Sequence, residues 1–447
     1  MTQKTPKIAV IGSGPMGLAC AYELLKNNYQ VDVYERDDRV GGMSASFDFD
    51  GLKIERYYHF ICLPDTPLFD LLDELELSDQ LCWRETKMGF FYNGVLYKWG
   101  NPIHLLRFPE LNWFSKLRYA LHIFYTKSIG NWESLDKINA IPWLKKWVGE
   151  KAYSMLWGGL FEYKFYEYKE NISAAWIGTR IKRVAQSRKN LLTEQLGYLK
   201  GGSDTLLSAL QERVLALHGN IYLSAGIERV TSIHDQLEAV VVNGEKRFYD
   251  GVVSTIPLPY VPRLVPDLSV ETLNKINGIA NCGVVCVILK LRHALTENFW
   301  LNINDPDMEI PGLIEYSNLN PVINDNPNAK HQGIVYIPFY MPKTHPKYQQ
   351  DNALFIEEVL GYLSRINSAF SKDWVLATHV SRYEFAQPIC SPKFYQQLPS
   401  MQTNIQGLVM ADTCYYYPED RGISESVKMG KQLCDLVIRS ARRTLHE

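Results

Sequence analysis

A glycine-rich turn between a predicted strand and a predicted helix restricts the fold of this chain more than any other feature. An apolar run from Lys7 leads into Gly12, Gly14 and Gly17, and a second strand-like run ends on Glu35. In this spacing the first glycine permits a tight turn, the second admits a pyrophosphate close to the backbone, and the third lets the helix pack closely on the strand. An acid at the end of the second strand accepts hydrogen bonds from a ribose. The sequence therefore predicts a βαβ unit that binds a dinucleotide.

Length, charge and hydropathy exclude several classes of protein. The chain has 447 residues with 46% hydrophobic content, which is enough for more than one domain. Its formal net charge of −2 gives no electrostatic case for nucleic-acid binding. No run reaches the roughly 18 uninterrupted apolar residues of a membrane span, and no signal peptide precedes the first strand. We therefore expect a cytoplasmic protein without a transmembrane segment.

The cysteines predict neither disulfides nor a metal site. Eight cysteines are scattered through apolar surroundings, and Cys282 and Cys286 form the only close pair in the sequence. No second pair or histidine cluster completes a zinc site. We therefore predict buried, reduced thiols, as in a reducing compartment.

The order of the predicted elements indicates one α/β domain interrupted by other material. An aromatic-rich stretch covers about residues 83–176, and we expect its tryptophans to be core. An amphipathic helix is predicted over 204–217, and a last strand and helix over 407–412 and 423–445. The predicted dinucleotide-binding domain is discontinuous, and a substrate domain is interleaved with it. Their expected ranges are 1–82, 196–281 and 405–447 for the first domain, and 83–195 and 282–404 for the second.

A second pair of glycines helps to decide which dinucleotide is bound. Glu35 is followed by Arg36, Arg39 and then by Gly41 and Gly42. The two glycines can bring backbone N–H groups to the pyrophosphate from its other side, and either arginine can balance its charge. Simple nicotinamide dehydrogenases do not need this element, whereas many flavoproteins carry it. We therefore predict FAD as the cofactor.

Four motifs are spread over the whole chain: the βαβ unit with its glycine extension, residues 197–206, residues 250–257, and residues 407–412 followed by 421–426. Together they resemble the flavin amine oxidase and protoporphyrinogen oxidase superfamily of FAD enzymes, to which UDP-galactopyranose mutase is a more distant relation. The chain departs from the family by having Ala411-Asp412 where Gly-Asp is commoner, but it keeps the acid. The aromatic middle of the chain matches nothing specific.

The resemblance implies an α/β fold with a Rossmann-like FAD-binding domain of the glutathione-reductase type, interleaved with an α+β substrate domain that carries a helical, aromatic-rich insertion. It also implies that the last strand and helix contact the ribityl chain and pyrophosphate of FAD. The expected FAD contacts are Gly12, Gly14, Pro15, Met16, Gly17, Glu35, Arg36, Arg39, Gly41, Gly42, Met43, Val230, Thr255, Asp412, Arg421, Gly422, Ile423 and Ser426.

The segment beyond Gly42 runs near the flavin ring if the family topology holds. It contains Arg56, Tyr58 and His59, which we predict as catalytic residues. Histidine titrates near neutral pH and serves as an acid or a base. The alternative is a packed sheet face in which His59 is a hydrogen-bonded structural residue.

Three further stretches have more than one interpretation. Residues 415–417, all tyrosines, either stack against a substrate or pack between domains. Residues 105–118 mix basic and aromatic side chains, and either contact a membrane surface or a lipid-linked substrate, or belong to the core. Residues 417–422 resemble proteins associated with sugar and polysaccharide pathways, which points to a sugar-linked substrate.

The predicted function is removal of a hydride from a C–N, C–C or C–O bond of a small substrate to FAD. Oxygen or another acceptor then reoxidises the flavin. One alternative is a non-redox flavoenzyme acting on a sugar nucleotide, like the mutase. Another is a flavin-binding subunit without catalysis. The motifs do not encode the substrate, the electron acceptor, the oligomeric state or the mode of flavin attachment.

Overall fold

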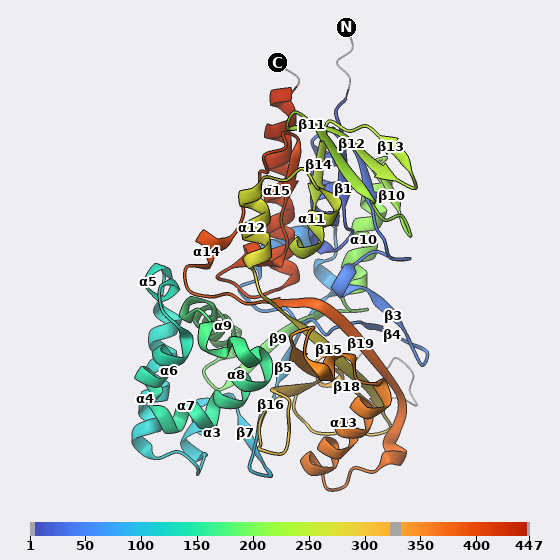
Figure 1. Ribbon diagram of the computed structural model, residues 1–447. Coiled ribbons are helices and arrows are strands. Elements are labelled where there is room, and N and C mark those ends of the chain that lie inside the picture. Colours follow the sequence, from blue (N-terminus) through green and yellow to red (C-terminus); the bar gives the residue numbers. More distant parts are fainter. Residues whose placement is uncertain (1–4, 322–331, 445–447) are drawn as a thin grey trace.

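Two large sheets organise the chain in the computed structural model, which describes residues 5–321 and 332–444. A parallel sheet of five strands lies at the top of Figure 1 with both chain termini, and a mostly antiparallel sheet of seven strands lies below it. The long strands β15 (Asn281–Leu291) and β19 (Val375–Pro388) run from the upper body into the lower one. The predicted α/β fold class, with a second α+β body, is confirmed. The domain boundaries stay a prediction.

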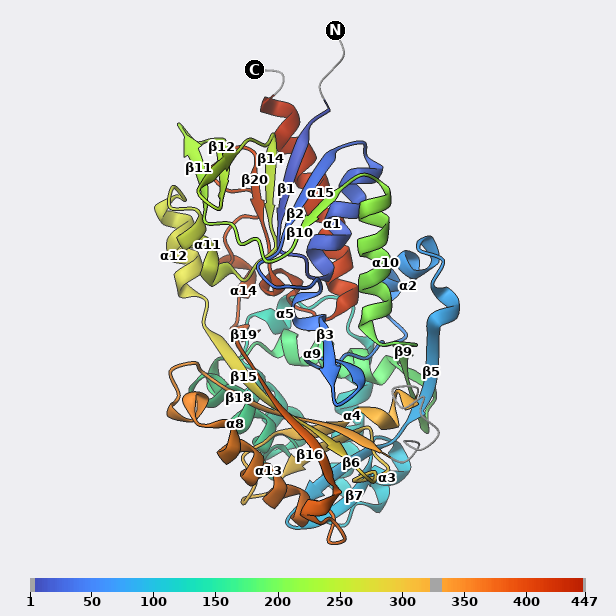
Figure 2. The same ribbon diagram turned by 90° about the vertical axis from the view of Figure 1, so that its right-hand side faces the viewer.

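The parallel sheet has the strand order β10-β2-β1-β14-β20. Its core is apolar because the sheet is covered on both faces, as parallel sheets are. The helices α1 (Pro15–Lys26), α10 (Ser203–Ala216) and α15 (Ile423–Thr444) cover one face, and a small sheet of β11, β12 and β13 lies on the other (Figure 2). The strands are β1 (Lys7–Ile11), β2 (Gln30–Tyr34), β10 (Asn220–Tyr222), β14 (Gly251–Ser254), β20 (Leu408–Met410), β11 (Arg229–Ile233), β12 (Gln236–Val242) and β13 (Glu245–Arg247).

The seven-stranded sheet has the order β19-β15-β18-β17-β16-β6-β7. The helix α13 (Asn352–Ile366) packs its apolar face on it, and Phe355, Val359 and Leu363 share a buried cluster with strand residues. The remaining strands are β18 (Gly333–Met341), β17 (Gly312–Glu315), β16 (Trp300–Asn304), β6 (Met88–Tyr92) and β7 (Val95–Trp99).

A bundle of helices lies beside the second sheet, at the lower left of Figure 1. Trp143 and Trp176 are 4% and 2% exposed, as expected for core, but Trp113 is 71% exposed. The expectation that the tryptophans form a core is therefore wrong for Trp113, because α4 turns this part of its surface to solvent. The helices are α3 (Pro102–Arg107), α4 (Trp113–Ser128), α5 (Glu133–Asp136), α6 (Ala140–Val148), α7 (Glu150–Leu156), α8 (Gly158–Phe165) and α9 (Ala174–Gln186).

Shorter elements complete the fold. A tight turn at Asn243-Gly244 joins β12 to β13. Of the predicted last helix, residue 445 lies outside the described residues. The remaining elements are β3 (Ser46–Phe49), β4 (Leu52–Glu55), β5 (Leu81–Thr86), β8 (Arg188–Asn190), β9 (Thr193–Leu199), α2 (Thr66–Glu74), α11 (Val261–Leu264), α12 (Val270–Gly278) and α14 (Phe394–Gln397).

The structure also bears on the cysteines, on membrane-spanning helices and on metal sites. All eight cysteines are free, and Cys82 alone is more than marginally accessible. Within residues 5–321 and 332–444, no helix has the length and apolar character needed to cross a bilayer. The same residues contain no group of three side chains that could hold a metal ion.

Candidate active site

The glycine turn after β1 has the geometry that a dinucleotide needs. Gly12 adopts a φ of 98° and donates its N–H to the carbonyl of Tyr34 at 2.9 Å, which ties the turn to β2. A Cβ on Gly17 would lie 2.0 Å from the Gly12 carbonyl oxygen, so α1 packs on the turn at a distance that only glycine allows. A Cβ on Gly14 would meet no atom within 4 Å, because this residue faces open space. The N-terminus of α1 therefore points into a cavity, as in phosphate-binding turns.

The carboxylate of Glu35 is held in place at the end of β2. Its Oε2 accepts hydrogen bonds from the backbone N–H of Ser13 at 2.9 Å and from the Ser13 hydroxyl at 2.8 Å. Its Oε1 accepts from the N–H of Asp37 at 2.9 Å. Each carboxylate oxygen accepts two hydrogen bonds, so these bonds fill Oε2 and leave one acceptor position on Oε1. Glu35 is therefore oriented for a ribose.

The second glycine pair lies directly beside the first turn. Gly41 has a φ of 114° and donates its N–H to the carbonyl of Ser13 at 2.9 Å. That N–H therefore joins the two turns instead of reaching a ligand. A Cβ on Gly42 would lie 3.6 Å from Gly14, so the two turns approach each other closely.

The residues that follow the last strand, β20, and the start of the last helix, α15, enclose the site from another side. Asp412, which follows β20, is 7% exposed, and it accepts hydrogen bonds from the N–H groups of Leu258 and Cys414, each at 2.8 Å. Burial raises the pKa of its carboxyl, although these bonds oppose the shift. The N-terminus of α15, at Ile423, follows eleven positions after Asp412.

One cavity of about 1120 Å³ connects these parts. Most predicted FAD contacts and all three predicted catalytic residues line it. They are Gly12, Gly14, Pro15, Met16, Glu35, Arg36, Gly42, Met43, Thr255, Asp412, Arg421, Gly422, Ile423 and Ser426, with Arg56, Tyr58 and His59.

Four predicted FAD contacts lie behind or beside the cavity. Gly17 and Gly41 hold the two turns together, as described above. Val230 is fully buried in β11, and its side chain belongs to the core of the small sheet. Arg39 pairs with Asp38 and donates to the carbonyl of Ser46.

The residues present fit an extended FAD. The glycine turn offers space for a pyrophosphate at the N-terminus of α1, and the oriented carboxylate of Glu35 lies at the end of β2. The cavity reaches from there to the aromatic side chains of Tyr58 and Trp300, which can enclose a ring system.

His59 and Glu55 form a hydrogen-bonded pair at the cavity wall. The Nδ1 of His59 lies 2.5 Å from Oε2 of Glu55, a residue that is 2% exposed, and its Nε2 lies 3.3 Å from the Ser44 hydroxyl. The other oxygen of Glu55 accepts from the N–H of Ser203 at 2.7 Å. The carboxylate therefore fixes the imidazole so that Nε2 is the atom left for acid–base chemistry.

Arg56 and Tyr58 occupy different parts of the cavity. Arg56 forms an ion pair with Asp37, whose backbone is bonded to Glu35, so it lies at the ribose end. The ring of Tyr58 packs edge-on against Trp300 at 5.8 Å and against Tyr336 at 5.9 Å. Arg56 therefore lies with the cofactor contacts, and Tyr58 belongs to the aromatic wall.

The three consecutive tyrosines divide between the two interpretations. Tyr416 lines the cavity. Tyr415 donates to the carbonyl of Pro399, and Tyr417 bonds to Ser173 and Asp136, which ties the chain to the helical bundle. Tyr415 and Tyr417 are therefore packing residues.

Sequence reasoning missed the wall that the helical bundle contributes. Lys164 of α8 and Arg180 of α9 line the cavity, together with Trp300 and Tyr340 of the second sheet. Their positions depend on contacts between segments far apart in sequence, and no local motif marks them.

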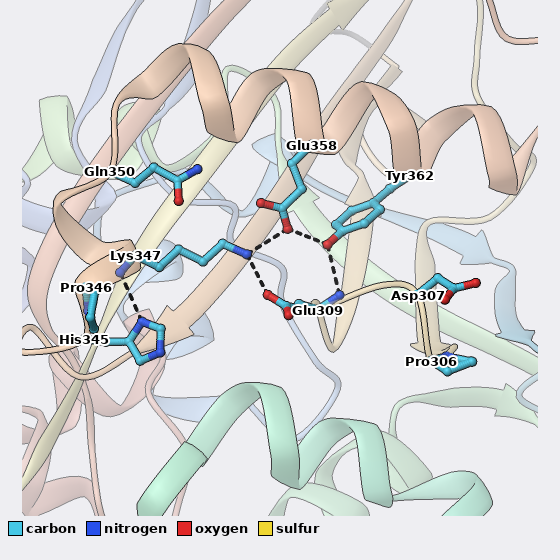
Figure 3. Close-up of a pocket in the computed structure, with 9 residues that line it drawn as sticks. All are labelled: Pro306, Asp307, Glu309, His345, Pro346, Lys347, Gln350, Glu358 and Tyr362. Atoms are coloured by element: carbon cyan, nitrogen blue, oxygen red, sulfur yellow. Dashed lines mark hydrogen bonds and ion pairs between the residues drawn. The ribbon is translucent and has the colours of Figure 1, made fainter.

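A second pocket lies between α13, the loop that joins β16 to β17, and the segment that follows β18 (Figure 3). Lys347 is its central charge, and its ammonium is paired with Glu309 at 2.8 Å and Glu358 at 2.7 Å. The hydroxyl of Tyr362 also bonds to Glu358. Because these polar groups satisfy one another, the pocket is a surface network and not the active site.

Comparisons with known proteins agree with this geometry. The sequence profile of the family described as flavin containing amine oxidoreductase matches residues 17–414. A 15-cis-phytoene desaturase of Synechococcus elongatus is 24% identical over 65% of this chain and 66% of its own length. A 4,4'-diapolycopen-4-al dehydrogenase of Metabacillus indicus is 25% identical over 80% of this chain and 79% of its own. Among solved structures, reduced UDP-galactopyranose mutase has a TM-score of 0.74 at 17% identity, covering 97% of this chain and 96% of that one.

Proposed function

Because this chain belongs to the family of flavin-containing amine oxidoreductases, we propose that it removes a hydride from a carbon atom of a small lipophilic substrate. The chain is an FAD-dependent oxidoreductase, as the four motifs predicted. The proposed substrate class goes further. Two relatives are named for reactions on carotenoids, and aromatic side chains line the same cavity as the glycine turn.

The observation that carries the proposal is the continuity of the cavity. One space joins the glycine turn to Tyr58, Trp300 and Tyr340, so an apolar substrate packs against aromatic rings beside the cofactor. Bound FAD supplies the hydride acceptor. Forming a double bond also releases a proton, which Nε2 of His59 accepts while Glu55 holds the imidazole at Nδ1. The aromatic wall excludes water from the reacting carbon.

Anaerobic reduction of the purified yellow protein tests this proposal. We expect an isoprenoid polyene or alcohol in detergent micelles to bleach the flavin absorbance, and putrescine to leave it unchanged. Trp300→Leu should weaken the response to the isoprenoid, because it removes a ring from the wall. The matched control is Trp374→Leu, since Trp374 packs on Phe370 outside the cavity. Bleaching by putrescine and not by the isoprenoid would refute the proposed substrate class.

A second candidate is a non-redox isomerisation of a sugar nucleotide. The fold match to UDP-galactopyranose mutase favours it, together with the resemblance of residues 417–422 to polysaccharide-pathway proteins. Under this alternative, turnover of a UDP-sugar requires prior reduction by dithionite and consumes no electrons. Substrate-dependent bleaching of the oxidised enzyme decides against it.

We also propose that the outer face of α4 docks on an anionic lipid bilayer. Five apolar side chains on this helix are more than half exposed: Trp113 (71%), Phe114 (67%), Leu117 (58%), Leu121 (53%) and Phe124 (61%). Their spacing places them along one helix face, and a contiguous exposed apolar face of this kind marks an interaction surface.

Charge complementarity identifies the partner of the α4 face. Neither α4 nor the adjacent α3 contains an acidic residue, and Arg107 and Lys127 are exposed on them. Basic residues beside an apolar helix face fit a bilayer with anionic headgroups. A lipophilic substrate would reach the enzyme from the same bilayer.

Vesicle co-sedimentation tests the docking. We expect binding to phosphatidylglycerol-containing vesicles to fall at least tenfold in Trp113→Ser with Phe114→Ser, because two large apolar side chains no longer enter the membrane. Phe248→Ser is the matched control, since Phe248 is 69% exposed on a different part of the protein. An unchanged affinity, or a dimer in solution that only the α4 variant dissociates, would contradict the docking.

A further inference from the structure

Three cations from separate parts of the chain converge on the cavity wall formed by the helical bundle. Lys164 comes from α8, Arg180 from α9, and Arg421 from the loop before α15, and all three line the cavity. Lys164 is 5% exposed. The buried Nε of Arg421 has no hydrogen-bond partner within the described part of the chain.

Aromatic rings surround Lys164 in place of a carboxylate. Its ammonium lies 4.9 Å from the ring centre of Tyr340 and 5.5 Å from that of Trp176. Among the described residues no carboxylate lies within ion-pair distance of this ammonium. Arg180 places its guanidinium 4.8 Å from the centre of the same Trp176 ring. Two like charges thus share one indole, and burial together with Arg180 lowers the pKa of Lys164 well below its usual value.

One carboxylate faces these three cations. Asp420 forms an ion pair with Arg180, and its second oxygen has no partner in the described structure. Burial alone would raise the pKa of Asp420, but the charges of Arg180 and Lys164 lower it to about 2. Asp420 therefore stays ionised, and the guanidinium groups of Arg180 and Arg421 alone outnumber this carboxylate at the wall.

We propose that Lys164, Arg180 and Arg421 bind a phosphoryl group carried by the substrate, an inference that rests on the proposed function of the cavity. A dianionic phosphate matches the excess of positive charge, and guanidinium and ammonium groups donate strong charge-assisted hydrogen bonds to its oxygens. Such a group occurs on phosphorylated isoprenoids and on nucleoside-diphosphate sugars. The phosphoryl group would hold one end of the substrate while the aromatic wall holds the carbon that reacts.

The location of the cluster separates it from the pyrophosphate of FAD. The pyrophosphate site predicted at Gly12 and Gly14 lies at the N-terminus of α1. The cluster instead lies over Tyr340, and Arg180 and Arg421 act electrostatically on Tyr58 of the aromatic wall. The three cations therefore lie at the substrate end of the cavity.

Calorimetric titration of the flavin-loaded enzyme tests the site, with inorganic phosphate, farnesyl phosphate and UDP as separate probes. We expect Lys164→Met and Arg180→Gln each to weaken phosphate binding at least tenfold without loss of flavin. Methionine has nearly the length of lysine and needs no charge burial, so Lys164→Met should fold. If it does not, Arg180→Gln decides the question. Lys151→Met is the control, because Lys151 is exposed on the neighbouring α7.

The outcomes separate the possible sources of the phosphoryl group. Tighter binding of farnesyl phosphate than of UDP identifies a lipid phosphate, and the reverse identifies a nucleotide. Unchanged phosphate affinity in both variants overturns the proposal, and loss of flavin from Lys164→Met overturns it too, since the cluster would then serve the cofactor. If no hydride donor bleaches the flavin while phosphate binding still depends on Lys164, the redox proposal fails and the phosphoryl site stands.

Discussion

Substitution of two glycines in the same turn should separate packing from cofactor binding. A Cβ on Gly17 would lie 2.0 Å from the Gly12 carbonyl oxygen and 2.9 Å from the Thr255 hydroxyl. Ordinary contact begins at 3.4 Å, so Gly17→Ala forces α1 and the turn apart by about 1.4 Å. The shift is resisted on the other side of α1, where a Cβ on Gly430 of α15 would already lie 2.6 Å from the carbonyl of Met16. These two contacts are between a Cβ and a backbone carbonyl oxygen, so no flexible side chain can relieve them by moving aside.

The cost follows from this overlap. Overpacking of a well-packed core costs about 1–3 kcal/mol, and a clash between backbone atoms lies at the upper end of that range. An unfolding entropy of about 2.1 cal/mol/K per residue gives roughly 0.9 kcal/mol/K for a chain of this length, so 3 kcal/mol lowers Tm by about 3 °C in a cooperative transition. Gly14→Ala is the matched control, because its Cβ meets no atom within 4 Å but enters the cavity.

Scanning calorimetry with and without added FAD, together with the flavin content, measures both effects. We expect Gly17→Ala to lower the Tm of the flavin-free protein. Gly14→Ala should leave that Tm unchanged and lose flavin affinity, because its methyl group occupies space that the pyrophosphate needs. A Gly17→Ala protein as stable as the wild type would refute the packing argument. A Gly14→Ala protein with full flavin content would refute the assigned position of the pyrophosphate.

Three further predictions concern a proton acceptor, a buried ion pair and a buried acid. His59→Asn should slow flavin reduction about 100-fold while keeping the flavin, whereas His293→Asn on the exposed surface should not; stopped-flow absorbance measures both. Arg183→Met should lower the free energy of unfolding by about 3 kcal/mol, because it leaves the buried carboxylate of Asp65, which Arg183 contacts at 2.8 Å, without its cation. Adding Asp65→Asn should restore much of this free energy, as measured by denaturant unfolding. Burial raises the pKa of Glu194 to about 7, so the folded state favours the neutral acid. The resulting stability is present below the unfolded pKa of about 4.5 and is lost as pH rises through 7. The free energy of unfolding of the wild type should therefore fall, relative to that of Glu194→Gln, by up to about 3 kcal/mol. A constant difference between the two proteins from pH 4 to about 8 would contradict that last expectation.

Local sequence was sufficient for much of the cofactor site. Gly12, Gly14 and Gly17 constrain backbone within a few residues of themselves, so their spacing predicts the turn before any tertiary contact is known. The hairpin at Asn243-Gly244 is local in the same sense, because its turn requires positive φ at adjacent residues. Val230 and Arg39 show the limit of this reasoning. Whether a strand residue faces a ligand or the core depends on the sheet that packs against it.

The helical bundle was the least predictable region. Its aromatic residues have helical spacing, but spacing does not tell which face of a helix another element will cover. The side chains of Trp143 and Trp176 are buried in the core and that of Trp113 faces solvent, although all three lie in one aromatic-rich stretch. A membrane-facing helix and a core helix bury similar residues, and they differ only in what covers them.

The amino-acid sequence alone predicted a dinucleotide-binding turn in an α/β fold, because glycine turns and strand ends have local geometry, and its resemblance to a known superfamily implied the FAD cofactor and the oxidoreductase class. The tertiary structure decided which charged side chains line the cavity wall formed by the helical bundle. Arg421 lies far along the chain from Lys164 and Arg180. The three side chains meet only because α8, α9 and the loop before α15 pack together. Charges brought together by packing leave no pattern along a sequence, and that is the physical reason why this wall of the cavity had to be seen in three dimensions.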